Sequence, residues 1–269
     1  MKDLDMNARF RPKDANTHYE ELEQYSVTRT KEISGMSAPY IKITDRCGRL
    51  VSRLVLLLGT VKPHSLQDAI IRDLMADVFD FLYESRPLIM AGKLNVAFPL
   101  ARRAYESLSL LHLCAIDKTW AVRWHEGKEI SNGVIRKELA KHPMGQPEEI
   151  MREAYKFFCS ATHPNRVLIP QRFLGEGNQY VLGVIGEPDL LLIVDYCMKT
   201  LAMWIWLLRI VVYFYRSVIA ERDKDHFEAL QQAHNEAKKV HEWLVANYSR
   251  LLGEFQSARE QPGAPSKIP

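Results

Sequence analysis

Hydrophobic positions recur every three to four residues through most of the chain, and this spacing predicts a mainly helical protein. The pattern predicts helices over residues 17–34, 46–61, 65–90, 95–116, 131–141 and 147–162, then from Pro188 to about residue 215, and over 222–257. Ser65 and Ser131 are expected N-caps, because a serine side chain accepts a hydrogen bond from a free N–H of the first turn. Pro87 is expected to bend or stop the third of these helices.

One segment departs from the helical pattern and reads as β structure. Between Arg166 and Ile185, two apolar runs flank the sequence Gly175-Glu-Gly-Asn178, which is typical of a hairpin turn. The sequence therefore predicts an all-α helical bundle of about seven or eight helices with a small β-hairpin insertion at 166–185. We expect a flexible leader over 1–16, a single helical domain over 17–258 and a disordered tail over 259–269.

The stretch from Leu201 to Tyr215 is apolar on every face except at Arg209. A membrane-spanning helix needs about 20 such residues, and charged residues close this run sooner. An arginine near its centre also disfavours insertion into lipid. We therefore expect the central helix of a soluble bundle, with membrane association as the alternative.

The last predicted helix carries a regular three-four stripe, a spacing typical of a coiled-coil seam. Its members are Phe227, Leu230, His234, Ala237, His241, Leu244, Tyr248, Leu251 and Phe255. The stripe predicts an antiparallel pairing with the preceding apolar helix, and self-association or a partner helix on the 222–257 seam is the alternative. His234 and His241 are two turns apart, which is wider than the usual spacing of zinc ligands on one helix, so no metal site is predicted.

Composition narrows the class of protein further. Apolar residues make up 47% and charged residues 26% of the 269 residues, and the net charge of +3 is too small to indicate nucleic acid by itself. The four cysteines form no C-x-x-C pair, and the first ten residues lack an apolar run, so the chain is expected in the cytoplasm. P-loop, H-E-x-x-H, G-x-S-x-G and dinucleotide-binding motifs are absent, so no cofactor is expected.

The candidate chemistry is an Arg-Arg-x-x-Glu step at Arg102, Arg103 and Glu106 within an apolar helix. At least one arginine can pair with Glu106 on the helix surface. Charges this close to a buried face need partners, and Tyr155 and His163 on the 147–163 segment are the best candidates, with Arg136 a further one. Glu106 and His163 would form a general acid/base pair with an arginine binding an anionic group, or the same residues would form a structural polar network.

The same residues carry a resemblance to a known group. The run Leu100-Ala-Arg-Arg-Ala-Tyr-Glu106, a helix bearing Arg136, and Tyr155-Lys-Phe-Phe-Cys-Ser-Ala-Thr-His-Pro164 together resemble an uncharacterised bacterial all-helical family of the domain of unknown function 5677 type. The resemblance covers about residues 65–220, implies an all-α fold and brings no established activity. It carries over Arg103, Glu106, Tyr155 and His163, and more weakly Arg136; the serine of the second motif is replaced by Cys159 or Ser160, depending on the alignment.

A weaker similarity is to the HEPN-like helical ribonucleases of toxin and phage-defence systems, whose signature is an arginine followed after four to six residues by a histidine. Arg11–His18 and Arg136–His142 show this spacing, about as often as chance gives. The leading functional hypothesis is thus an intracellular bacterial HEPN-like ribonuclease or phage-defence component with RNA as partner. The alternative is a non-catalytic helical interaction module.

The hypothesis assigns a role to each candidate residue. Arg103, Glu106, Arg136 and His163 are the candidate catalytic residues. Arg102, Tyr155 and Trp124 are candidate binding residues, with the indole of Trp124 available to stack on a base.

Overall fold

The computed structural model describes residues 15–162, 173–174, 179–180 and 190–260, and within these the regular secondary structure is helical apart from one short strand pair. The helices are α1 (Ala15–Met36), α2 (Ala38–Gly59), α3 (Leu66–Met90), α4 (Leu94–Ile116), α5 (Lys118–His125), α6 (Asn132–Ala140), α7 (Glu148–Thr162), α8 (Leu190–Phe214), α9 (Arg216–Arg222) and α10 (Lys224–Glu260). The all-α class is confirmed. The number of helices was predicted too low, because the short helices α5 and α9 were not counted.

The β-hairpin insertion predicted over 166–185 is not seen as such. The described residues of this segment contain two strands of two residues each, β1 (Phe173–Leu174) and β2 (Gln179–Tyr180), which pair antiparallel. The remainder of the segment lies outside the described residues, as do most of the predicted leader and of the predicted tail.

Helix boundaries follow local capping chemistry. The Ser65 side chain accepts a hydrogen bond from the Asp68 backbone N–H at 3.1 Å, and Ser131 does the same for Val134 at 3.4 Å, so both predicted N-caps are confirmed. Pro87 does not stop α3, which continues to Met90. Pro87 and Tyr83, whose carbonyl loses its usual donor there, are both exposed, so water can satisfy that carbonyl.

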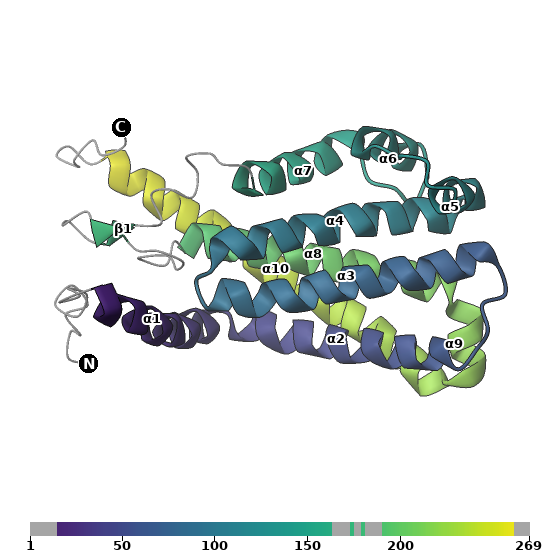
Figure 1. Cartoon of the computed structure of the whole chain (residues 1–269), viewed down its shortest axis with the longest axis horizontal. Coiled ribbons are helices and arrows are strands. Elements are labelled where there is room, and N and C mark those ends of the chain that lie inside the picture. The colour runs from purple at the N-terminus through teal and green to yellow at the C-terminus, as the bar shows by residue number, and fades with distance from the viewer. Residues whose placement is uncertain (1–14, 163–172, 175–178, 181–189, 261–269) are drawn as a thin grey trace.

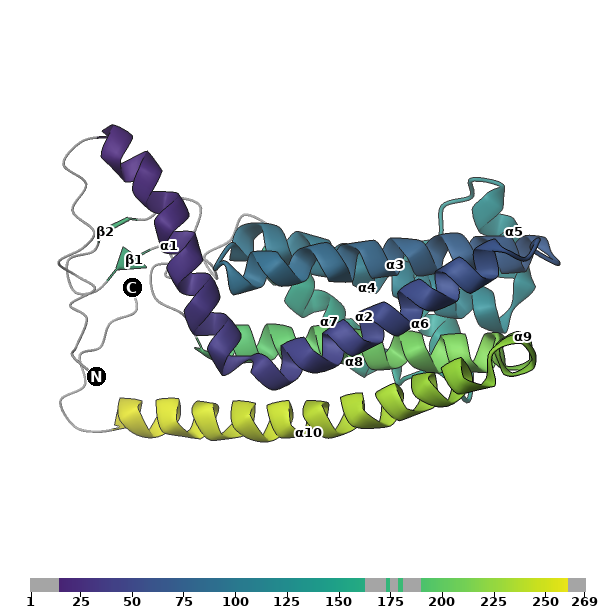
Figure 2. The same ribbon diagram turned by 90° about the horizontal axis from the view of Figure 1, so that it is seen from below.

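The helices form a layered bundle elongated along one axis (Figure 1). Helices α3 and α4 form an antiparallel hairpin whose tight turn is made by Gly92, with a φ of 72° that favours glycine. Helix α8 packs against α4, α2 and α10, while α6 and α7 cover the outer side of α4. Figure 2 shows α10 running back along α8 for most of the length of the molecule.

Helix α8 supplies much of the core. Its segment Leu191–Phe214 is long and apolar enough to cross a membrane, and 61% of its most apolar window is buried inside the protein. Tyr196, Leu201 and Leu207 are fully buried, and Tyr196 donates a hydrogen bond to the equally buried Ser85 on α3. The burial of α8 agrees with its prediction as the central helix of a soluble bundle.

The seam on α10 faces the rest of the chain. Leu230, Ala237 and Leu244 of the predicted stripe are buried, and α10 packs mainly on α8 and α2. Phe227 and Tyr248 are half-buried, and the side chains of the last two stripe residues lie outside the described set. The predicted pairing of the last helix with the preceding apolar helix is therefore present within one chain.

Candidate functional site

Helix α4 brings Arg102 and Glu106 together as the Arg-Arg-x-x-Glu step predicts. The two residues are one turn apart, and Arg102 Nε donates to Glu106 Oε1 at 3.0 Å. Both side chains are 21% exposed, so the pair lies at the rim of the core rather than inside it. A ligand can therefore reach this pair from solvent.

Helix α7 places Tyr155 against the pair. Arg102 Nη2 donates to the Tyr155 hydroxyl at 3.1 Å, which confirms Tyr155 as the expected partner. The guanidinium groups of Arg102 and Arg136 lie 5.4 and 5.0 Å from the centre of the Tyr155 ring. One aromatic ring thus attracts two cations through its negative face.

Helix α6 contributes two residues, one of which was not predicted. Asn132 Nδ2 lies 3.4 Å from both Glu106 Oε1 and the Tyr155 hydroxyl, so its amide bridges α4 and α7. Arg136, one turn later, has Nε and Nη1 buried without an acceptor. We call these five residues, Arg102, Glu106, Asn132, Arg136 and Tyr155, the Arg102 cluster.

The Arg102 cluster is short of negative charge. It contains two guanidinium groups and one carboxylate, and that carboxylate is already bonded to Arg102 and Asn132. Burial is the largest effect on the pKa of Arg102 and lowers it, but the bond to Glu106 and the charges of Cys159, Glu106 and Tyr155 together outweigh burial, so the net pKa is raised and Arg102 stays charged. The free N–H groups of Arg136 are therefore the unsatisfied donors in a positively charged cluster, a combination suited to an anion.

A buried tyrosine fixes the position of α7 on α4. The Tyr105 hydroxyl donates to the Met151 carbonyl at 2.9 Å, and its ring lies 5.8 Å from that of Phe158. Burial raises the pKa of Tyr105 to about 12, so this residue remains a neutral donor. Tyr105 therefore orients the helix that presents Tyr155 to the cluster.

Two predicted residues lie away from the cluster, and a third falls outside the described residues. Arg103 is exposed, and its guanidinium lies 5.9 Å above the Phe81 ring on α3, away from α6 and α7. Trp124 is 37% exposed on α5, which follows the far end of α4 from Arg102. His163 immediately follows the last residue of α7 and lies outside the described residues.

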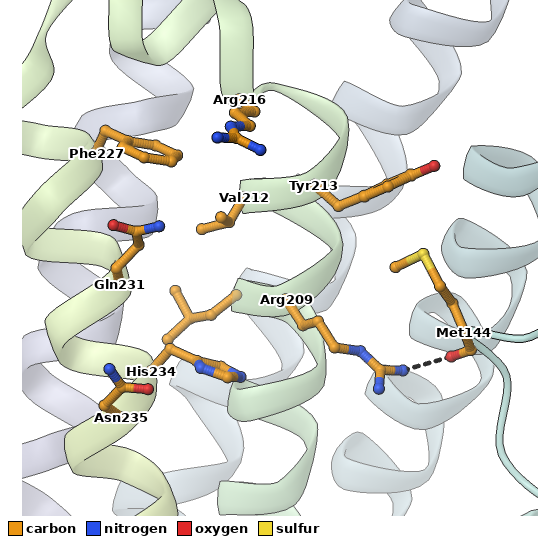
Figure 3. A pocket seen from close by; sticks show the side chains of 10 residues that line it. Met144, Arg209, Val212, Tyr213, Arg216, Phe227, Gln231, His234 and Asn235 are labelled. Carbon is orange, nitrogen blue, oxygen red and sulfur yellow. Dashed lines mark hydrogen bonds between the residues drawn. The ribbon is translucent and has the colours of Figure 1, made fainter.

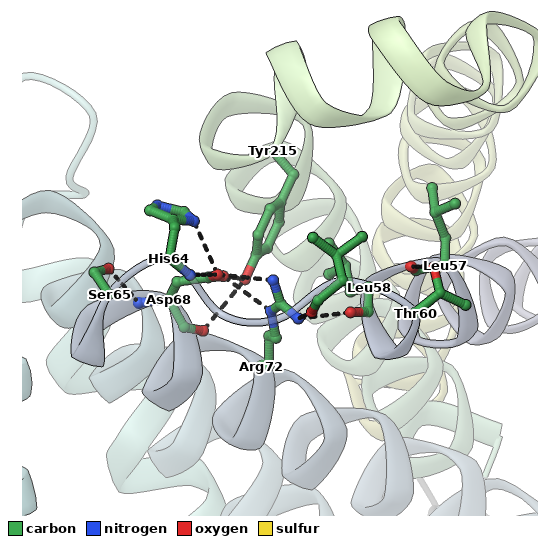
Figure 4. A network of polar contacts seen from close by, with 9 residues as sticks. Leu57, Leu58, Thr60, His64, Ser65, Asp68, Arg72 and Tyr215 are labelled. Atoms are coloured by element: carbon green, nitrogen blue, oxygen red, sulfur yellow. Dashed lines mark hydrogen bonds and ion pairs between the residues drawn. The ribbon is translucent and has the colours of Figure 1, made fainter.

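A second polar cluster, centred on Asp68, joins three helices (Figure 4). The Asp68 carboxylate is fully buried and accepts bonds from Arg72 Nη2 at 2.7 Å, Tyr215 at 2.7 Å and the His64 backbone N–H at 3.1 Å. Arg72 Nη1 also donates to the carbonyls of Leu58 and Val61, both at 2.6 Å. The Asp68 cluster thus ties the end of α2 to the start of α3 and the end of α8.

The Asp68 cluster has the chemistry of a structural clamp. Burial alone would raise the pKa of Asp68, but the bonds from Arg72, Tyr215 and His64 lower it below its usual range. The carboxylate already accepts bonds from Arg72, Tyr215 and His64 of the described chain, so its oxygens are satisfied without a ligand. Sequence reasoning missed the clamp, because the pairing of residues 68 and 215 depends on how α8 packs.

No metal site is evident in the described part of the chain, and three of its thiols are buried and protonated. No group of three or more His, Cys, Asp or Glu residues there has the geometry to hold a metal ion. The four cysteines are free, and burial raises the pKa of Cys47, Cys114 and Cys197 to about 12, so these three remain protonated. Comparison with protein-family models, with curated proteins and with solved structures gave no match.

Proposed function

We propose that this chain is a cytoplasmic bacterial ribonuclease of the HEPN-like, phage-defence kind that binds the RNA backbone at the Arg102 cluster. The observation that carries the proposal is Arg136, whose Nε and Nη1 are buried without an acceptor beside a second arginine. Two guanidinium groups against one carboxylate leave a place for one negative charge. A phosphodiester oxygen is the acceptor that fits such a fork of donors.

The reaction supported by these groups is metal-independent cleavage. The 2′-oxygen of the RNA attacks the neighbouring phosphorus, the bond to the 5′-oxygen breaks, and a 2′,3′-cyclic phosphate and a 5′-hydroxyl result. One group must take the proton of the 2′-hydroxyl and another must protonate the leaving oxygen. We assign these roles to Glu106 and His163, with Arg102 and Arg136 stabilising the charge on the phosphate.

Single substitutions test the proposal, with RNA cleavage and unfolding measured on the same preparations. We expect His163→Ala and Glu106→Gln to lower the cleavage rate about 100-fold or more, because general acid/base groups contribute about that much. Arg136→Gln should weaken RNA binding. The free energy of unfolding should stay within about 0.5 kcal/mol of that of the unmodified chain, since a guanidinium with two unpaired buried donors stabilises the fold little.

Arg102 and Arg103 provide a matched pair. Arg102→Gln should lower cleavage, whereas Arg103→Gln, one residue away but facing Phe81, should leave it unchanged. Equal losses from both would contradict the assignment of the cluster.

The interaction-module alternative rests on a different observation. The bonds of Arg102, Glu106, Asn132 and Tyr155 connect α4, α6 and α7 to one another. If the cluster serves only to hold these helices, Glu106→Gln and Arg102→Gln will lower the unfolding midpoint, and no RNA cleavage will be found for any form of the chain. This outcome would replace the ribonuclease with a non-catalytic helical module.

A further inference from the structure

A cavity of about 550 Å³ lies between the end of α8, α9, the first turns of α10 and the loop before α7. Its size is in the range of small-molecule sites. Figure 3 shows Val212 of α8 facing α10, while Arg209 extends toward Met144. None of these residues belongs to the Arg102 cluster or the Asp68 cluster.

Basic groups line the cavity without a counter-charge. Arg209 and Arg216 both border it, and none of the residues that line it is acidic. Within the described part of the chain, Arg209 donates only to the Met144 carbonyl, at 2.7 Å, and its Nε is buried without a partner. Burial lowers the pKa of Arg209, which reflects the cost of holding this cation away from water and from any carboxylate. An anionic ligand would offset that cost.

A histidine from α10 adds a second unsatisfied group. The Nε2 atom of His234 is buried and has no hydrogen-bond partner. Burial lowers the pKa of His234, and the charges of Lys238 and Arg209 lower it further, so the ring is neutral near pH 7. A neutral imidazole can donate one hydrogen bond to a ligand oxygen without adding charge.

The rest of the lining suits a flat heterocycle. Phe227 is half-buried and Tyr213 is 60% exposed, and both aromatic rings line the cavity, where a base could stack. Gln231 and Asn235 are one turn apart on α10 and both exposed. Carboxamide side chains are the groups that pair with the donor and acceptor edge of a base such as adenine.

We propose that this cavity is a binding site for a nucleoside phosphate. Its phosphate groups bind Arg209 and Arg216, with His234 as a further donor. The base packs on Phe227 and is recognised by Gln231 and Asn235. Arginine is suited to this role because its planar fork of donors matches phosphate oxygens.

The loop that accepts the Arg209 bond is rigidly placed. A Cβ added at Gly145 would lie 1.7 Å from the Leu139 carbonyl oxygen, so only glycine permits this close approach of the loop to α6. The Gly145 N–H donates to the His142 carbonyl at 2.8 Å. The Met144 carbonyl therefore holds the Arg209 guanidinium in a fixed position before any ligand binds.

Calorimetric titration of the full chain tests the site with ADP, pyrophosphate and adenosine as probes. We expect saturable binding of ADP and binding about tenfold weaker or worse for pyrophosphate and for adenosine, because each lacks one half of the contacts. Equal affinity for pyrophosphate and ADP would overturn the base-binding part. No saturable binding of any probe would overturn the whole proposal.

Variants distinguish the cavity from general attraction to a basic surface. Arg209→Gln and Arg216→Gln should each weaken ADP about tenfold. Arg216 is exposed, so its variant should fold even if that of Arg209 does not. Arg222→Gln is the matched control, since Arg222 is an exposed arginine of α9 that does not line the cavity. An equal loss in the control would overturn the site.

A competition experiment distinguishes a free nucleotide from the end of an RNA chain, which also presents a base and a phosphate. A 5′-phosphorylated RNA oligonucleotide should compete with ADP weakly. Binding of the oligonucleotide about tenfold tighter than ADP would overturn the assignment to a free nucleotide.

Discussion

At the scale of single residues, His112 shows how burial controls ionisation in this core. It lies on the apolar stripe of α4 and is 1% exposed. The indole of Trp206 donates to His112 Nδ1 at 3.1 Å, which fixes Nδ1 as an unprotonated acceptor. Burial, with smaller effects of Arg209 and His142, lowers the pKa of His112 to about 4.

The pKa of His112 predicts a pH-dependent stability. The unfolded chain binds a proton near pH 6.5, whereas the folded chain binds it near pH 4, so stability is full above 6.5 and is lost as the pH falls toward 4. The loss amounts to about 3 kcal/mol for this residue. Urea unfolding at pH 7.5, 5.5 and 4.5 measures it.

His112→Gln provides the comparison, because glutamine keeps an acceptor for Trp206 but does not titrate. The buried His226 and the half-buried His234 and His241 also have lowered pKa values, so both proteins should lose stability in acid. The unmodified chain should lose more unfolding free energy than His112→Gln, and the difference should be most of the contribution calculated for His112. Parallel pH curves for the two proteins would refute this account.

The residues of the candidate site were predictable as far as local geometry decides them. The pairing of Arg102 with Glu106 follows from helical spacing alone, and Tyr155 follows from its place on the next apolar helix of suitable spacing. Arg103 was predicted in the same group but lies over Phe81, since one residue along a helix turns a side chain by about 100°. Asn132 carries no signal in sequence, because only the packing of α6 on α4 and α7 brings its amide to Glu106.

At the scale of elements, the Asp68 cluster is the device that holds α2, α3 and α8 in register. Asp68→Asn would leave Arg72, which is only 15% exposed, without its carboxylate, and breaking such a buried pair costs about 3–5 kcal/mol. Chemical denaturation should show this loss at pH 7. Asp73→Asn on the same helix is the control, because Asp73 is exposed and should change stability by less than about 0.5 kcal/mol. Similar losses for both would show that the clamp contributes little.

Element boundaries were predicted where a cap or a strong apolar period marks them. The ends of α4 and the start of α3 agree with the sequence within a residue or two. Helix α2 begins eight residues earlier than its predicted start at 46, with Pro39 in its first turn, a position that proline favours. The short helices α5 and α9 were missed, since seven or eight residues are too few to establish a period.

At the scale of the whole molecule, the burial of α8 depends on α10. The sequence allowed an alternative role for each helix: α8 could span a membrane, and the seam of α10 could join two chains. In the structure α10 covers α8 and α2 within one chain, and small residues let the helices approach, with Ala233 and Ala237 fully buried. From this packing we expect a monomer that stays in solution without detergent.

Enlarging Ala237 tests whether the packing holds in solution. Ala237→Leu adds three carbons to a filled contact, and such overpacking costs about 1–3 kcal/mol. Ala246→Leu adds the same atoms at an exposed position of α10 and should be neutral. Denaturation in detergent-free buffer gives the stability, and light scattering gives the mass.

If the seam instead joins two chains, Ala237→Leu will lower the mass from dimer to monomer, and the unfolding midpoint will depend on protein concentration. If α8 spans a membrane, the chain will require detergent to remain in solution. Because α10 already covers α8 in the single chain, we expect a reduced midpoint at constant monomeric mass.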